Sequence, residues 1–240
     1  MRLHFWYQFI LLYVPAFGAP PAGIVAGNAS IVETAGVHAC VHNSLGVNLM
    51  NRFLYREAAE EFRKALAEDP NCNLARINLG IALYYDAELD AARQVFEEAL
   101  ARDPANPYAN YSLGLVLKHK GLTDEAEACF RRVADADPKC AAAFYNLGAV
   151  HARQDRPKEA EADLRHALEL DPENAAALYN LGSLLVKLGR AREGYEYFDK
   201  FRALPPDAGI TSGMGSGPQY GKAGKYALVS RGSGAKAPQD

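Results

Sequence analysis

LGIALYYDAELDAARQVFEEALARDP, residues 79–104, is the stretch that decides the fold of this chain. Its Leu-Gly pair, its small and large apolar residues and its closing Asp-Pro return 34 residues later in LGLVLKHKGLTDEAEACFRRVADADP, residues 113–138. Leu-Gly occurs five times along the chain at this spacing, and Asp-Pro occurs four times. A period of this length predicts a solenoid in which each unit is one pair of helices.

Each unit can be numbered from 1 to 34 with the glycine of Leu-Gly at position 8. Glycine in a helix costs roughly 1 kcal/mol relative to alanine, so its recurrence predicts that the second helix packs closely against it. Proline at position 32 cannot continue a helix and therefore ends each unit. The repeated region covers residues 39–206, and the five units are 39–72, 73–106, 107–140, 141–174 and 175–208.

These residues resemble the tetratricopeptide repeat, whose pattern has an aromatic at position 4, Leu-Gly at 7 and 8, Tyr at 11, Ala at 20, Phe or Tyr at 24, Ala at 27 and Pro at 32. The chain keeps positions 7, 8, 20, 24 and 32, whereas position 11 is leucine in four units and His151 in the fourth. The resemblance implies an all-α fold, an α-solenoid in which antiparallel helix pairs form a right-handed superhelix.

Residues 1–30 have a different composition. A positive start at Arg2 is followed by an apolar run over 5–17 and by small residues from Gly18, which is the plan of a signal peptide. The run is shorter than the roughly 20 residues of a membrane-spanning helix. We expect export to the periplasm or the exterior. A cytoplasmic location follows if the segment is not a working signal, and membrane contact only if it is not cleaved. Residues 31–38 are expected to be a linker.

The other end of the chain changes character as well. Residues 209–240 are rich in glycine and are predicted to be a degenerate sixth unit or a disordered tail. The four cysteines contain no CxxC pair, and Cys72 and Cys140 lie two units apart, beyond disulfide reach. We therefore expect Cys40, Cys72, Cys129 and Cys140 to be small apolar fillers.

No motif for catalysis, a cofactor or a metal is found. His38 and His42 share one helix face, but Cys40 lies on the other side of that helix, so a metal site is not expected. His151 stands at a core position and is expected to be a buried, hydrogen-bonded imidazole. The net charge of −3 gives no electrostatic footprint for nucleic acid.

Binding is expected on the side of each first helix that faces away from Leu-Gly, which lines the concave groove of a superhelix. Position 6 carries small polar residues and resembles the asparagine ladder of tetratricopeptide superhelices that hold extended peptides. Tyrosines at positions 2 and 5 flank this row, and positions 12 and 13 become cationic along the stack. The candidate groove residues are Asn78, Ser112, Asn146, Asn180, Tyr108, Tyr111, Tyr145, Tyr179, Lys118, Arg153 and Lys187. A purely structural role for the amides and tyrosines is the alternative.

These features predict a non-enzymatic adaptor without a cofactor, which binds a protein or peptide segment bearing an acidic residue or a free carboxylate. The carboxylate clamp of chaperone-binding family members does not map here, since only Asn78 fits its pattern. The alternative is that the repeats recruit substrates or partners for a larger enzyme or secretion machine whose catalytic domain lies outside these residues.

Overall fold

A computed structural model describes residues 26–204 of the chain, with side chains from residue 37 on. Residues 1–25 of the expected export segment and the tail 209–240 lie outside the described residues. Between residues 26 and 204 the chain forms ten helices and no strand, which confirms the predicted all-α solenoid. The helices are α1 Ala26–Asn51, α2 Tyr55–Glu68, α3 Asn73–Tyr85, α4 Leu89–Arg102, α5 Pro107–His119, α6 Thr123–Ala136, α7 Ala141–Arg153, α8 Pro157–Leu170, α9 Ala175–Lys187 and α10 Ala191–Ala203.

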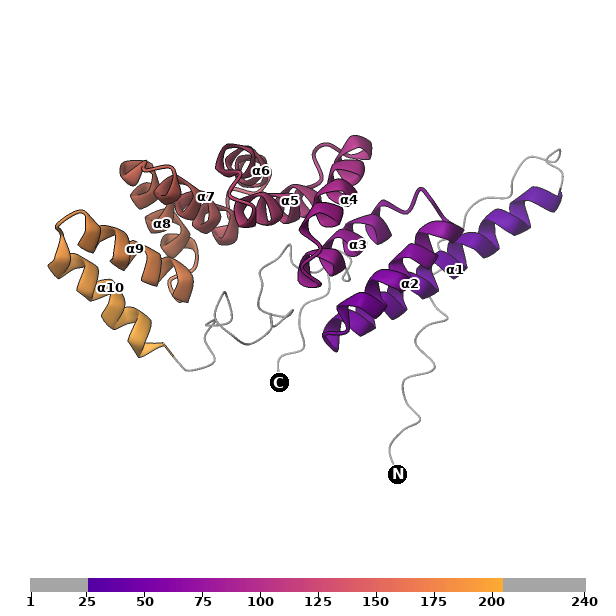
Figure 1. The fold of residues 1–240 in the computed structure, drawn as a ribbon, viewed down its shortest axis with the longest axis horizontal. Coiled ribbons are helices and arrows are strands. Elements are labelled where there is room, and N and C mark those ends of the chain that lie inside the picture. The colour runs from indigo at the N-terminus through magenta and orange to yellow at the C-terminus, as the bar shows by residue number, and fades with distance from the viewer. Residues whose placement is uncertain (1–25, 205–240) are drawn as a thin grey trace, which may run out of the picture. The chain divides into compact units, whose positions relative to one another are not determined.

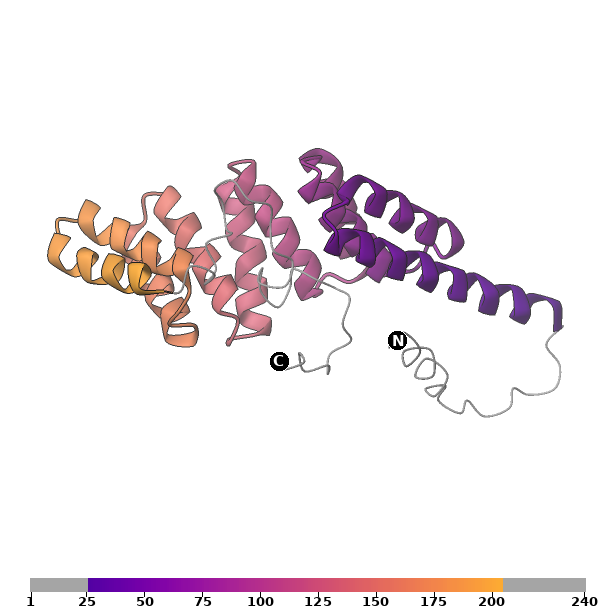
Figure 2. The same cartoon turned by 90° about the horizontal axis from the view of Figure 1, so that it is seen from below.

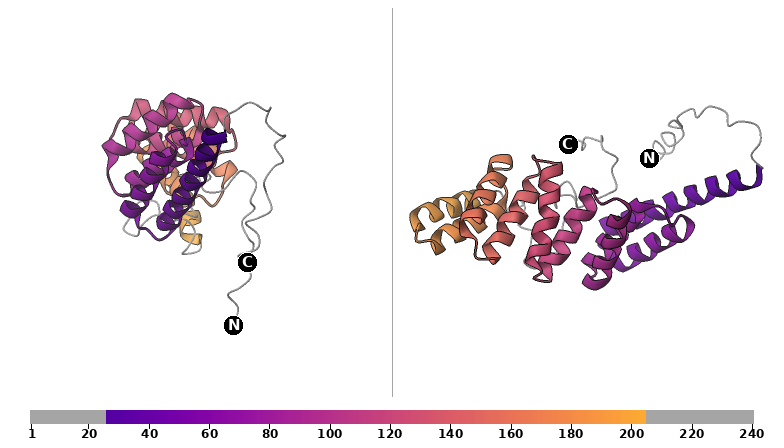
Figure 3. Two further views of the ribbon diagram at one scale, coloured as in Figure 1. Left: turned by 90° about the vertical axis from the view of Figure 1, so that its right-hand side faces the viewer. Right: turned by 90° about the horizontal axis from the view of Figure 1, so that it is seen from above.

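Consecutive helices pack as pairs, and the pairs follow one another in chain order (Figure 1, Figure 2). The chain divides into two compact units after residue 34, and the second unit holds the stack from residue 35 to 204. Within this stack α3 packs against α4 and also against α2 and α5, and the later pairs repeat the arrangement (Figure 3). Every first helix after α1 therefore contacts both its own second helix and the preceding unit.

The turn inside each pair has the same conformation in all five units. Position 15 lies in the left-handed region, with φ between 57° and 79°, at Phe53, Ala87, Gly121, Asp155 and Gly189. The next backbone N–H donates back to the carbonyl of position 11 at 2.9–3.0 Å, which satisfies a carbonyl left open at the helix end. This shared turn brings the second helix back along the first.

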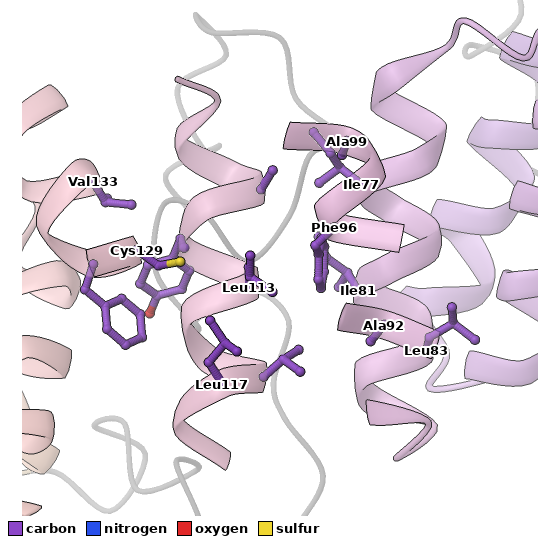
Figure 4. Packing of buried hydrophobic residues seen from close by; sticks show 14 of the residues in the cluster. Ile77, Ile81, Leu83, Ala92, Phe96, Ala99, Leu113, Leu117, Cys129 and Val133 are labelled. Carbon is purple, nitrogen blue, oxygen red and sulfur yellow. The ribbon is translucent and has the colours of Figure 1, made fainter. Parts of the chain in front are cut away.

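Close packing at the glycine of position 8 holds each pair together. In the second unit a Cβ added to Gly80 would lie 2.6 Å from a ring carbon of Phe96, which is fully buried. Figure 4 shows Phe96 between Ile77, Ile81 and Ala92, with the side chains of the two helices interlocked. The predicted reason for the recurring glycine is therefore confirmed.

Two expectations about the first unit are wrong. Helix α1 begins at Ala26, so residues 31–38 are helical and do not form a linker. Cys40 is exposed, whereas Cys129 and Cys140 are buried as expected of apolar fillers. Leu74, at the same position of the second unit, is exposed as well, so this position lies outside the packed core of the first two units.

The helix-capping position 34 alternates between asparagine and cysteine. Asn106 and Asn174 accept a hydrogen bond from the backbone N–H three residues on, at 3.1 and 3.0 Å, whereas Cys72 makes no such bond. Because an asparagine cap contributes about 0.5–2 kcal/mol, we expect Cys72→Asn to stabilise the protein by about 1 kcal/mol in urea denaturation. The matched control is Asn174→Cys, which should destabilise by a similar amount. A Cys72→Asn variant that is less stable than the parent would contradict this assignment.

Candidate functional site

Positions 5 and 6 of successive units are joined by hydrogen bonds. Asn78 donates to the side-chain oxygen of Asn43 at 2.9 Å, and Asn146 donates to the hydroxyl of Tyr111 at 3.2 Å. Asn180 and Tyr145 stand at the same two positions one unit further on, where the Asn180 amide opposes the rise that burial causes in the pKa of Tyr145. In each case the amide at position 6 meets the polar side chain at position 5 of the preceding unit. The amides therefore form a ladder that ties the units to one another.

The contact between the second and the third unit lacks this bond, and the sequence shows why. Position 5 of the second unit is Ile77, which is buried and offers no polar atom, and position 6 of the third unit is Ser112 instead of asparagine. A long amide opposite isoleucine would lose its partner, and an unsatisfied buried amide costs about 1–3 kcal/mol. The residue types at the two positions therefore change together.

The expectation that the polar residues at position 6 lie open in the groove is wrong for three of the four candidates. The exposed fractions of Asn78, Ser112 and Asn146 are 4%, 6% and 1%, and Asn180 is half-buried. Asn146 is also satisfied by the carbonyl of Ala142, which accepts from its amide at 2.8 Å. Their assignment to ligand binding stays a prediction, but the hydrogen bonds give these side chains a structural role.

The tyrosines of the predicted groove fall into two groups. Tyr111 is 5% exposed, and Tyr108 and Tyr145 are half-buried, so they contribute area between the units. Tyr179 in the last unit is 53% exposed and lies against Phe198 and Phe201, with ring centroids 5.6 and 5.8 Å away.

Lys118 and Arg153 form the most distinctive cluster on the first helices. Lys118, at the end of α5, donates to the amide oxygen of Asn146 and lies 5.6 Å from the centre of the Tyr145 ring. Arg153, at the end of α7, is exposed and donates to the backbone carbonyl of Lys118 at 2.9 Å. The cluster thus brings together two cations, an aromatic ring and an amide from two neighbouring units.

No carboxylate of residues 37–204 forms an ion pair with Lys118 or Arg153. Burial lowers the pKa of Lys118 to about 8, and the positive charge of Arg153 adds to this effect. A half-buried ammonium without a counter-ion has lost hydration that the amide oxygen of Asn146 and the Tyr145 ring replace only in part, since neither carries a full negative charge. The cluster is therefore suited to an anionic group from outside the chain.

The third predicted cation does not belong to this cluster. Lys187 is 71% exposed at its side chain, and its ammonium lies 3.8 Å from the carboxylate of Asp155. Asp155 stands in the turn of the preceding unit, at a position that the sequence pattern did not single out. Toward the other end of the stack, Tyr84 and Tyr85 on α3 pack with Tyr55 and His119, and they place further aromatic rings in the second unit.

The expected burial and hydrogen bonding of His151 are confirmed. Its ring is 3% exposed, with Nδ1 2.6 Å from Asp163 and Nε2 3.4 Å from Glu127. Burial opposes the ionisation of Glu127, but hydrogen bonds from Gln154 and Arg156 and the nearby imidazole of His151 outweigh it and lower its pKa to about 2. These contacts join α6, α7 and α8, and we interpret the cluster as structural. Within the described part of the chain no group of residues is arranged to hold a metal ion.

Comparisons with known proteins agree with the fold. Sequence profiles described as tetratricopeptide repeat match residues 45–107, 83–150, 141–174 and 164–194. No curated protein matches the chain. MamA 41-end from Desulfovibrio magneticus RS-1 has a TM-score of 0.65 at 24% identity, covering 70% of this chain and 95% of that chain. Pseudomonas aeruginosa pilF has a TM-score of 0.64 at 23% identity, covering 71% and 77%. At these identities the likeness concerns the fold.

None of the helices from residue 26 to 204 has the length and apolarity needed to cross a membrane.

Proposed function

Because this chain belongs to the tetratricopeptide repeat family, we propose that it is a non-enzymatic scaffold that binds an extended, acidic segment of a partner protein along its first helices. The single observation that carries the acidic part of this proposal is the cluster of Lys118 and Arg153 without a carboxylate partner among residues 37–204. A ligand carboxylate placed between them would form charge-assisted hydrogen bonds, which contribute about 1.5–3 kcal/mol each.

Two neighbouring features suit the same ligand. The Tyr145 ring offers a rigid apolar surface beside the cations, as aromatic residues do in many interfaces. The tyrosines Tyr84 and Tyr85 lie on α3, two helices earlier along the stack, and could contact apolar side chains of a segment that is several residues long. The expected ligand therefore carries its acidic group toward the fourth unit and its apolar residues toward the second.

The test separates binding from stability. Proteins captured from an extract by the full chain are compared with those captured by a Lys118→Met, Arg153→Gln variant. We expect the variant to lose its acidic partners at low salt, with affinity at least about tenfold weaker, because one charge-assisted bond exceeds the 1.4 kcal/mol that equals a factor of ten. Its melting temperature should change little, because methionine removes the cost of a half-buried charge while the amide oxygen of Asn146 loses its donor.

The matched control is Lys187→Met, which removes one positive charge from an exposed lysine that already has a partner in Asp155. It should leave capture unchanged. Capture by the parent should also fall at high salt, since the screening length drops to about 3 Å at 1 M. If the Lys118→Met, Arg153→Gln variant captures the same proteins as the parent, the proposed site is wrong.

A further inference from the structure

The first unit presents an uncovered face, which we call the leading face and which consists of Val41, Ser44, Leu45 and Leu54. Val41 and Leu45 stand at positions 3 and 7 and are 60% and 46% exposed. In the four later units the same two positions are 0–6% exposed, because they pack against the preceding unit. The leading face is therefore the kind of surface that each later unit buries against the unit before it. We call these buried contacts between neighbouring units the inner junctions.

The last unit also presents an exposed apolar face, on the side that would meet a following unit. We call it the trailing face, and it consists of Tyr179, Tyr195, Phe198 and Phe201. Tyr179 at position 5 is 53% exposed, whereas its counterparts Ile77 and Tyr111 are 2% and 5% exposed. Tyr195 at position 21 is 56% exposed. Terminal units of soluble repeat proteins normally carry a polar outer face. Here the last unit is more aromatic than the inner ones, so this face is built to be covered.

The inner junctions show which positions meet across a junction. Position 5 bonds to position 6 of the next unit, as in the pair Tyr111 and Asn146. Position 21 meets position 16 of the next unit, as in the ion pair of Glu127 and Arg156 at 2.7 Å. The same contacts between the trailing face of one chain and the leading face of another would join Tyr179 to Ser44.

The contact between positions 21 and 16 would also join compatible side chains. Position 21 is Tyr195 on the trailing face and position 16 is Leu54 on the leading face, so two apolar side chains replace the ion pair of the inner junction. Val41 and Leu45 would then pack where Ala143 and Leu147 pack inside the stack. We propose that the trailing face of one chain binds the leading face of a second copy, so that the stack continues from chain to chain. Such a head-to-tail contact is not closed by symmetry and extends with concentration.

One electrostatic contact in this register is unfavourable, and it provides a direct test of the proposal. Position 14 meets position 18 of the preceding unit, where opposite charges pair, as Asp86 does with Arg56 at 3.4 Å. Between chains these positions would be Arg52 and Arg192, two like charges. Reversing one of them should therefore strengthen association, and only the head-to-tail register predicts that gain.

The experiment measures the mass of the full chain by sedimentation velocity over a range of concentrations. The leading face is blocked by Val41→Glu with Leu45→Glu, and the trailing face by Tyr179→Ser with Tyr195→Glu. All four residues are exposed, and circular dichroism checks that both variants remain helical. We expect the parent to associate, each blocked variant alone to stay monomeric, and an equimolar mixture of the two to form dimers only. Arg192→Glu should associate roughly threefold to tenfold more tightly at low salt.

Three results would overturn the proposal. A parent that stays monomeric at its highest soluble concentration would mean that another occupant covers the trailing face, such as residues 205–240 of the same chain. A leading-face variant that dimerises alone would show that two trailing faces pair with each other. Association that survives both blocks in one chain would place the contact elsewhere, for instance in the apolar residues 5–17. Because these readouts use no other protein, the result is independent of the proposed acidic partner.

Discussion

Gly80→Leu should destabilise the protein by about 3 kcal/mol, at the upper end of the range for overpacked cores. The first atom of the new side chain would already lie 2.6, 2.7 and 2.9 Å from three ring carbons of Phe96. That ring is fully buried among Ile77, Ala92 and Ala99, so it cannot move aside without displacing them. Helices α3 and α4 would have to separate, and the contacts of α3 with the first and third units would be strained as well.

Ala101→Leu is the matched control for this prediction. Ala101 is exposed on α4, in the same helix pair, and leucine there adds three carbons, one fewer than Gly80→Leu adds, to a residue that faces solvent. Surface substitutions of this kind usually change stability by less than about 0.5 kcal/mol. Urea denaturation followed by circular dichroism gives both values. An equal loss in the two variants would show that the glycine has no packing role.

The packing within each pair could be predicted because the restraint is local and repeats five times. In the sequence, Leu-Gly stands at a fixed number of residues before a small residue and a large apolar one. This spacing predicts a single arrangement, in which the second helix crosses the first at the glycine. The identical turn at position 15 was harder to predict from the sequence, because only two of its five residues, Gly121 and Gly189, are glycines that favour the left-handed conformation. Phe53, Ala87 and Asp155 adopt the same conformation without a glycine, so this turn is imposed by the packing of the pair.

The contacts between units were predicted less well. A helical wheel of one helix places position 6 opposite the buried Leu-Gly face, which led to the expectation of an exposed row of amides. The wheel leaves out the preceding unit, which covers the same side and buries Asn78 and Asn146. A signal was present in the sequence, since Ser112 replaces asparagine in the one unit that follows an isoleucine at position 5.

The difference between Lys118 and Lys187 could not be predicted from sequence either. Both are lysines at the end of a first helix, and their surroundings come from other units. Lys118 lies against Tyr145 and Asn146 of the next unit, whereas Lys187 reaches Asp155 in the turn before it. Only the stacking of the units determines which of the two lacks a carboxylate.

The second large effect is expected at His151, where leucine is the residue that the other four units carry at position 11. His151→Leu restores the common residue, yet we expect it to destabilise the protein by about 2 kcal/mol. Asp163 would lose the nitrogen that lies 2.6 Å from its carboxylate, and Glu127 would lose one of its partners. The side chains of Asp163 and Glu127 are only 21% and 12% exposed, so water replaces the lost contacts incompletely.

A second substitution decides why His151→Leu loses stability. The cause is either that Asp163 is left without its partner or that leucine does not fit the site. Asp163→Val in the His151→Leu background gives positions 11 and 23 the residues of the second unit, which are Leu83 and Val95. Replacing both members of a buried polar pair by apolar residues is often close to neutral. The double variant should therefore recover most of the lost stability, while Glu127 keeps its ion pairs with Arg131 and Arg156. A double variant as unstable as His151→Leu alone would mean that Glu127, and not Asp163, depends on the imidazole.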